Sequence, residues 1–94
     1  MARIDFESYE TAPIGGAKST MQDIQAATLL NRGLECSIGR NGKSDLIDAH
    51  KWFNLAALKG NSEAQRYRQE IAQEMESAEI AEAQRAAREW LRTH

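Results

Sequence analysis

The sequence is poor in the residues that build disulfide-bonded and β-sheet folds. It has one cysteine and one proline, and aromatic residues make up 6% of its 94 positions. The single Cys36 cannot form an internal disulfide, and it has no second cysteine or histidine cluster with which to bind zinc. Few aromatics beside abundant alanine favour closely packed helices over a β-sandwich. Because the only proline is Pro13, every later segment can be helical.

Charge and hydropathy argue against two further classes of protein. The chain has 12 basic and 14 acidic residues, for a net charge of -2, so it has no basic surplus to bind a phosphate backbone. The start MARIDFESYE lacks the apolar core of a secretory signal, and no run approaches the ~20 apolar residues of a membrane span. We therefore expect a soluble, cytoplasmic protein without a nucleic-acid or membrane partner.

Hydrophobic periodicity predicts a first helix from about Thr20 to Ser37. Ser19 and Gln22 match the positions of a capping box at its start. Apolar residues then recur at helical spacing, which indicates one buried face. The predicted stripe consists of Ile24, Ala27, Leu30, Leu34 and Ile38.

Three more helices are predicted after this one. Asp45 is expected to cap the second, which ends at Gly60, and Ser62 with Gln65 is expected to cap the third. Ser77 opens the fourth, whose polar face is charged. The apolar stripe of this fourth helix consists of Ile80, Ala83, Ala87, Trp90 and Leu91. The sequence thus predicts an all-α fold of about four helices in antiparallel hairpins.

Small and aromatic residues recur at fixed spacing through the first hairpin. In chain order they are Gly33, Cys36, Gly39, Asp45, Ala49, Trp52, Phe53, Ala56, Ala57, Gly60 and Ala64. This spacing resembles the Sel-one-like repeat of the tetratricopeptide-like superfamily, whose second helix reads A-x-x-W-[YF]-x-x-A-A. Cys36 replaces a tyrosine of the repeat, and Arg32, Asn41 and Gly42 also depart from it. The resemblance implies a short α-solenoid of the small bacterial type with one clear repeat.

The resemblance divides the chain into three parts. Residues 1–18 are expected to form an N-terminal arm that is extended or ordered by a partner. Residues 19–64 form the repeat hairpin, and residues 65–94 form a degenerate second hairpin that caps the stack. A solenoid generally has three or more units. An apolar face of the first hairpin should therefore remain exposed unless the arm, a second copy or another protein covers it.

The sequence offers little for catalysis. His50 and His94 have no cysteine or serine partner at a recognisable spacing, and we expect His50 to be a partly exposed helix residue. Cys36 is expected to be a small buried thiol. We therefore expect no enzyme activity, and no catalytic, cofactor-binding or metal-binding residue.

The stretch SIGRNGKSD, residues 37–45, resembles the end of a phosphate-binding loop, G-x-x-x-x-G-K-[ST]. The first glycine of that motif would stand at position 37, which is Ser37, and the motif requires a preceding strand where we expect a helix. We interpret the stretch as the turn of the repeat hairpin, in which Gly39 and Gly42 supply backbone freedom. A small-ligand-binding regulator stays open as an alternative function.

The resemblance instead implies protein recognition, through the concave side formed by the first helix of each hairpin. The favoured hypothesis is an adaptor or accessory subunit that binds a larger protein complex through its exposed hairpin face and N-terminal arm. A self-associating structural homo-oligomer is the other alternative. The candidate partner-binding residues are Ile4, Phe6, Tyr9, Asn31, Arg32, Glu35, Arg66 and Gln69.

Overall fold

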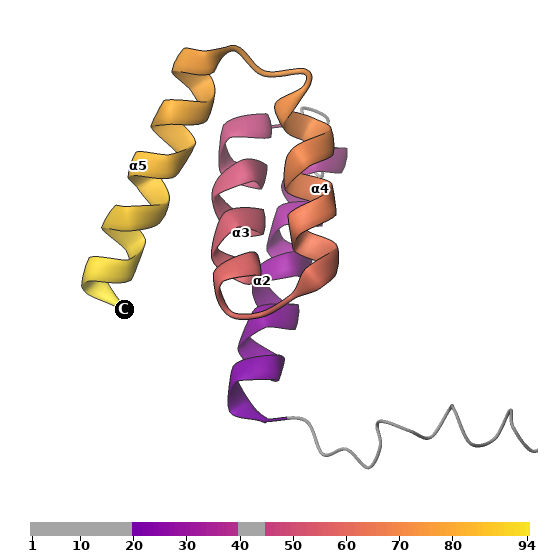
Figure 1. Cartoon of the computed structure of the whole chain (residues 1–94), viewed down its shortest axis with the longest axis vertical. Coiled ribbons are helices and arrows are strands. Elements are labelled where there is room, and N and C mark those ends of the chain that lie inside the picture. The colour runs from indigo at the N-terminus through magenta and orange to yellow at the C-terminus, as the bar shows by residue number, and fades with distance from the viewer. Residues whose placement is uncertain (1–19, 40–44) are drawn as a thin grey trace, which may run out of the picture.

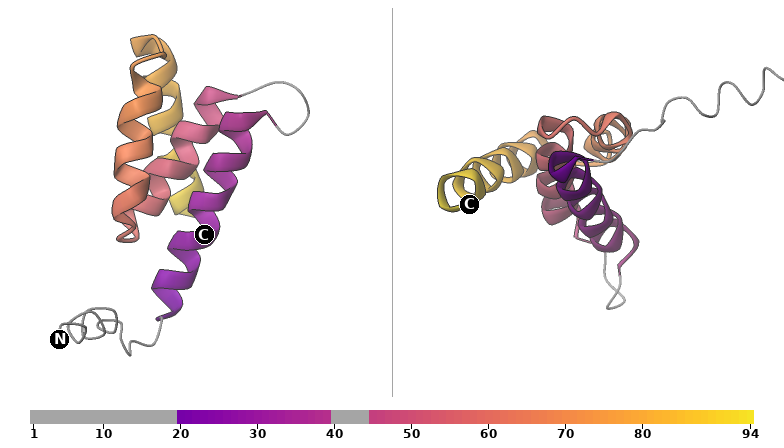
Figure 2. Two further views of the ribbon diagram at one scale, coloured as in Figure 1. Left: turned by 90° about the vertical axis from the view of Figure 1, so that its right-hand side faces the viewer. Right: turned by 90° about the horizontal axis from the view of Figure 1, so that it is seen from below.

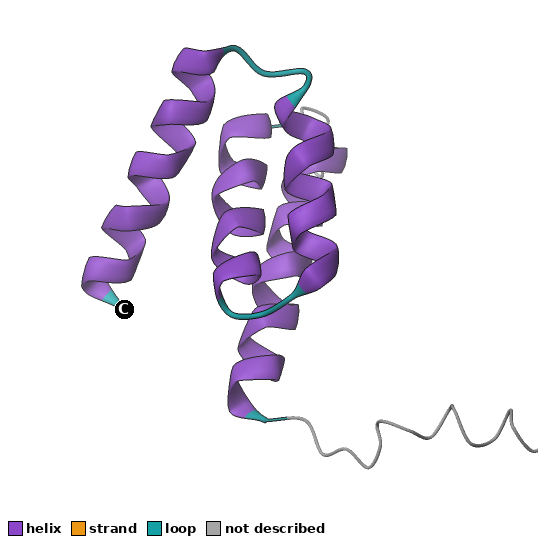
Figure 3. Cartoon of the chain, viewed as in Figure 1, coloured by secondary structure: helices purple, strands orange, loops and turns teal. Residues whose placement is uncertain are grey.

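The computed structural model describes residues 20–39 and 45–94, and every regular element in these ranges is an α-helix. The helices are α2 (Met21–Ile38), α3 (Leu46–Leu58), α4 (Ser62–Ala72) and α5 (Ser77–Thr93) (Figures 1 and 3). Successive helices run in opposite directions and are joined by short connections. The predicted all-α fold of helical hairpins is confirmed.

Helix α3 is the centre of the fold. It packs against α2, α4 and α5, whereas these three outer helices barely touch one another. Figure 2 shows the outer helices spread around α3, with α2 and α5 diverging from it in the view from below. Helix α5 thus packs on α3 and not closely along α4, so the last two helices form a more open pair than a tight hairpin.

The first helix begins one residue later than its predicted cap implies. The hydroxyl of Thr20 accepts a hydrogen bond from the amide of Asp23 at 3.0 Å, and the Asp23 carboxylate accepts one from the amide of Thr20 at 3.2 Å. These two residues satisfy each other's amides as a capping box. The helix is thus capped by Thr20, whereas Ser19, the predicted cap, lies outside the described residues.

The caps of the next two helices follow from short polar side chains. Asp45 caps α3 as predicted and accepts a hydrogen bond from the amide of Asp48 at 3.0 Å. Asn61 caps α4 by accepting one from the amide of Ala64 at 2.9 Å. Asparagine is among the most favoured N-cap residues, so Ser62 becomes the first helical residue and not the predicted cap.

A glycine ends α2 at the hairpin turn. Gly39 has a φ of 77°, in the left-handed region that glycine adopts without steric cost. The amide of Asp45 donates to the carbonyl of Cys36 at 2.9 Å and so joins the two helix ends. Gly42 and Lys43 lie outside the described residues. Because a helix precedes this stretch, the strand that a phosphate-binding loop requires is missing there.

The face of α2 that meets the core differs from the predicted stripe. Of that stripe only Leu30 is buried, while the side chains of Ile24 and Ile38 are 52% and 77% exposed. The buried residues of α2 are Ala26, Leu29, Leu30 and Gly33. The helix is therefore rotated so that its glycine, and not its isoleucines, faces the core.

The reason for this rotation is a close approach between Gly33 and Phe53. A Cβ atom at Gly33 would lie 2.5 Å from two carbons of the Phe53 ring, well inside van der Waals contact. Phe53 is fully buried, and its ring also stacks on Tyr67 of α4 with centroids 5.4 Å apart. One aromatic side chain of α3 thus packs against both α2 and α4.

Trp52, the preceding residue, connects α3 to α5. Its ring meets Trp90 edge to face, with centroids 5.9 Å apart and planes at 82°. Because successive helical residues point about 100° apart, Trp52 and Phe53 reach different neighbours. The pair therefore holds all three outer helices on α3.

We expect Gly33→Ala to lower the free energy of unfolding. The added methyl group overlaps a fixed ring, and overpacking of this kind costs about 1–3 kcal/mol. The better helix propensity of alanine offsets about 0.5–1 kcal/mol of this cost, so the free energy of unfolding should fall by about 1 kcal/mol. Urea unfolding followed by far-ultraviolet circular dichroism measures it.

The matched control is the same substitution in a Phe53→Leu background. Leucine lacks the ring carbons that the new methyl group would meet, so Gly33→Ala should then cost less than in the natural chain. An equal cost in both backgrounds would contradict the proposed cause.

Candidate functional site

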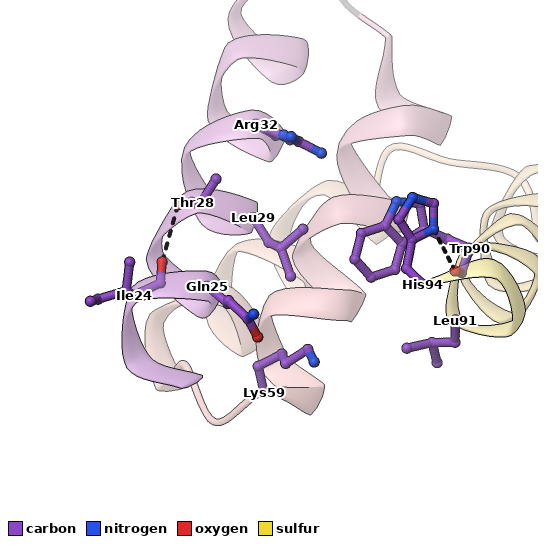
Figure 4. Close-up of a pocket in the computed structure, with 9 residues that line it drawn as sticks. All are labelled: Ile24, Gln25, Thr28, Leu29, Arg32, Lys59, Trp90, Leu91 and His94. Carbon is purple, nitrogen blue, oxygen red and sulfur yellow. Dashed lines mark hydrogen bonds between the residues drawn. The ribbon is translucent and has the colours of Figure 1, made fainter. Parts of the chain in front are cut away.

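A groove of about 430 Å³ lies between α2 and α5 (Figure 4). It exists because both helices pack on α3 but barely on each other. One wall is formed by α2 residues Ile24, Gln25, Thr28, Leu29 and Arg32. The opposite wall is formed by Trp90, Leu91 and His94, and Lys59 at the C-cap of α3 lies between the walls.

The groove is lined by both apolar and polar side chains. Leu29 is buried, Trp90 is half-buried, and the side chains of Ile24 and Leu91 are 52% and 43% exposed. The hydroxyl of Thr28 donates to the carbonyl of Ile24 at 3.1 Å, so it is already satisfied within its own helix. Apolar side chains gathered in a concave surface are typical of binding sites.

Trp90 is held in place on two sides. The imidazole of His94 stacks on its ring with centroids 4.3 Å apart and planes at 5°, and Trp52 packs against it edge to face. Nδ1 of His94 donates to the carbonyl of Trp90 at 3.0 Å, which fixes the stacked imidazole. The groove therefore presents an ordered aromatic surface.

The charged side chains that line the groove have a single sign. Its two residues with permanent charge, Arg32 and Lys59, are both basic, although the whole chain has a net charge of -2. Among the described residues neither forms an ion pair with a carboxylate. The Arg32 guanidinium lies 4.9 Å from the centroid of the Trp52 ring. The surface therefore suits a segment that combines apolar and acidic side chains.

Of the predicted partner-binding residues, Arg32 lines the groove. Asn31 and Glu35 are exposed on α2 but do not line it. Arg66 and Gln69 are exposed on α4, a helix that contributes nothing to the groove. The structure thus gives these side chains no common cavity, and their part in partner binding stays a prediction.

The predicted arm residues Ile4, Phe6 and Tyr9 lie outside the described residues. Three of the groove residues, Ile24, Trp90 and Leu91, belong to the apolar stripes that the sequence predicts to be buried, and Gln25, Thr28 and Lys59 are not predicted to take part in any site. The sequence contains one indication of the groove. A helix that packs on the core by one face has a single apolar stripe, whereas the first helix has apolar residues on more than one face, so some of them must be exposed.

His50 is buried, so the expectation of a partly exposed residue is wrong. Its side chain is 3% exposed and its Nδ1 has no hydrogen-bond partner among the described residues. The cause is the central position of α3, which is covered by three helices and so has little solvent-facing surface. Burial lowers the pKa of His50, and the positive charge of Arg68 lowers it further.

Cys36 is half-buried and packs against the core. Burial raises the pKa of its thiol, and the nearby carboxylates of Asp48 and Asp45 raise it further. The thiol is therefore protonated at neutral pH and a poor nucleophile.

Comparison with protein-family models, with curated proteins and with solved structures finds no match. The resemblance to the Sel-one-like repeat therefore rests on the residues alone. In the part of the chain that the structure describes, no helix is long and apolar enough to cross a membrane. The same part contains no group of three or more histidine, cysteine, aspartate or glutamate side chains that could hold a metal ion.

We expect the thermal stability to fall as the pH drops below 6.5. The unfolded chain protonates His50 near its ordinary pKa of 6.5, while the folded protein keeps it neutral to a lower pH. The stabilisation is complete above 6.5 and is lost as the pH falls toward the folded-state pKa. Midpoints of thermal unfolding across this range measure the effect.

The variant His50→Gln should have a flatter dependence of the unfolding midpoint on pH. Gln65→Ala on α4 is the control, because it replaces an exposed side chain that has no titrating group and should leave the slope unchanged. Identical slopes for the natural chain and His50→Gln would show that another group is responsible.

Proposed function

We propose that this protein is a protein–protein interaction module, an adaptor or accessory subunit whose groove between α2 and α5 binds a segment of a larger protein. The observation that carries the proposal is one concave surface that combines exposed Ile24 and Leu91 with Arg32 and Lys59, which have no carboxylate partner among the described residues. The partner segment has apolar side chains for the first pair and acidic ones for the second.

The groove favours binding because part of it is already ordered. Trp90 is fixed by His94 and Trp52, and Arg32 lies against the ring of Trp52. Side chains that are ordered before binding lose less conformational entropy when a partner arrives. Aromatic and arginine side chains in such positions commonly carry much of the binding energy of an interface.

The size of the groove sets the strength of the contact. Complete burial of one aliphatic side chain contributes about 1.5–3 kcal/mol. Ile24 and Leu91 are each about half buried before a partner binds, so each can add only about half of that amount. A micromolar complex requires about 8 kcal/mol. The partner must therefore also contact flanking surface, such as Met21, which is 68% exposed one turn before Gln25 on α2.

Photo-crosslinking tests this function. A photoreactive amino acid at Ile24 or at Leu91 should crosslink one partner protein in cells. The same group at Glu70 of α4 or Arg85 of α5, both exposed and outside the groove, should not. The crosslinked peptide should contain both apolar and acidic residues, and its synthetic copy should bind the purified chain.

The variant Arg32→Glu should weaken that binding by roughly tenfold, as expected for loss of about 1.4 kcal/mol of charge complementarity. Crosslinks from groove positions to a second copy of this chain alone would favour the homo-oligomer instead. Equal crosslinking from groove and control positions would count against a specific site.

A further inference from the structure

We propose that the N-terminal arm, residues 1–18, occupies the groove between α2 and α5 in the free protein. The chain would thereby cover its own binding site until a partner segment of the same chemistry displaces the arm. The inference rests on the proposed function, since it treats the groove as a site for peptide segments. It adds that the arm is the first segment to occupy the groove, and that the arm regulates the access of a partner to it.

The chemistry of the arm matches that of the groove. Residues 4–10 read IDFESYE, in which apolar and acidic side chains are interleaved. The apolar members are Ile4, Phe6 and Tyr9, and the acidic members are Asp5, Glu7 and Glu10. This is the combination that Leu29, Trp90 and Leu91 together with Arg32 and Lys59 are suited to bind.

The charged side chains of residues 4–10 and those that line the groove have opposite signs. The chain as a whole is acidic, with a net charge of -2, yet the charges that line the groove are those of Arg32 and Lys59. Within residues 4–10 every charged side chain is acidic. Placing the two together pairs cations that have no carboxylate partner among the described residues.

The arm is long enough to reach. It joins the fold at Thr20, and Arg32, the most distant α2 residue of the groove, lies about 18 Å further along the helix axis at 1.5 Å per residue. The stretch from Tyr9 to Thr20 can span up to about 36 Å when extended. The segment of residues 4–10 can therefore lie along the groove in either direction.

A covalently attached segment needs little intrinsic affinity. A linker of this length gives an effective concentration of about 1 mM. A segment with a Kd of about 0.1 mM would then fill the groove about nine tenths of the time. A second copy of the chain at micromolar concentration would need a far lower Kd. The weak contact that the groove supports therefore favours the arm of the same molecule.

Paramagnetic relaxation enhancement on the full chain tests the proposal. The single native cysteine is first removed by Cys36→Ala, and a nitroxide label is attached through Ala2→Cys. We expect the label to broaden the amide signal of Leu29 and the indole signal of Trp90. The loss of signal should persist on dilution, because the contact is within one molecule.

Two sets of variants assign the contact. Ile4→Ser with Phe6→Ser should restore the groove signals, and so should Arg32→Glu with Lys59→Glu. Adding Asp5→Lys and Glu7→Lys to the Arg32→Glu, Lys59→Glu chain restores opposite charges and should bring the broadening back. If the groove substitutions had acted only by disturbing the fold, these arm substitutions would not restore it. The matched control, Arg66→Glu with Arg85→Glu, makes the same change in net charge at exposed positions outside the groove and should leave the broadening intact.

Three outcomes would overturn the proposal. One is the absence of broadening at groove signals. Another is broadening that appears only when labelled and isotope-enriched chains are mixed, which would make a second copy the occupant. The third is broadening that no arm or groove variant changes. None of these measurements includes a partner, so their failure is distinct from a failure of the crosslinking that tests the interaction module.

Discussion

The packing of the Phe53 ring against Gly33 constrains the rest of this structure. It brings α2 so close to α3 that only a glycine fits at the crossing, and it fixes which face of α2 is buried. The same ring stacks on Tyr67 of α4, while its neighbour Trp52 meets Trp90 of α5. Two consecutive aromatic residues on one helix thus position the three others.

The groove is a consequence of this arrangement. Because α2 and α5 are both held on α3, and because neither packs extensively on the other, a space remains between them. The rotation of α2 that buries Gly33 also turns Ile24 outward beside that space. The contact that stabilises the hairpin therefore also determines which side chains a partner would meet.

Local features of the fold could be predicted from the sequence, whereas the site could not. The cap at Asp45 is predictable because a short acidic side chain at a helix start satisfies nearby amides, and this depends only on neighbouring residues. The orientation of α2 depends on Phe53, twenty positions away, so its apolar residues alone did not decide between two possible faces. Lys59 and Leu91 line the same groove only because α5 packs on α3, and this packing cannot be read from either segment alone.

The contact between Trp52 and Trp90 gives the molecule an intrinsic optical reporter. These are the only two tryptophans of the chain, and both lie where α5 meets α3. Nearly all of the ultraviolet-excited emission of the protein therefore originates at one junction, immediately beside the groove. Occupancy of the groove and detachment of the last helix would both change this emission without any added dye, and the two events can be followed in the unmodified chain.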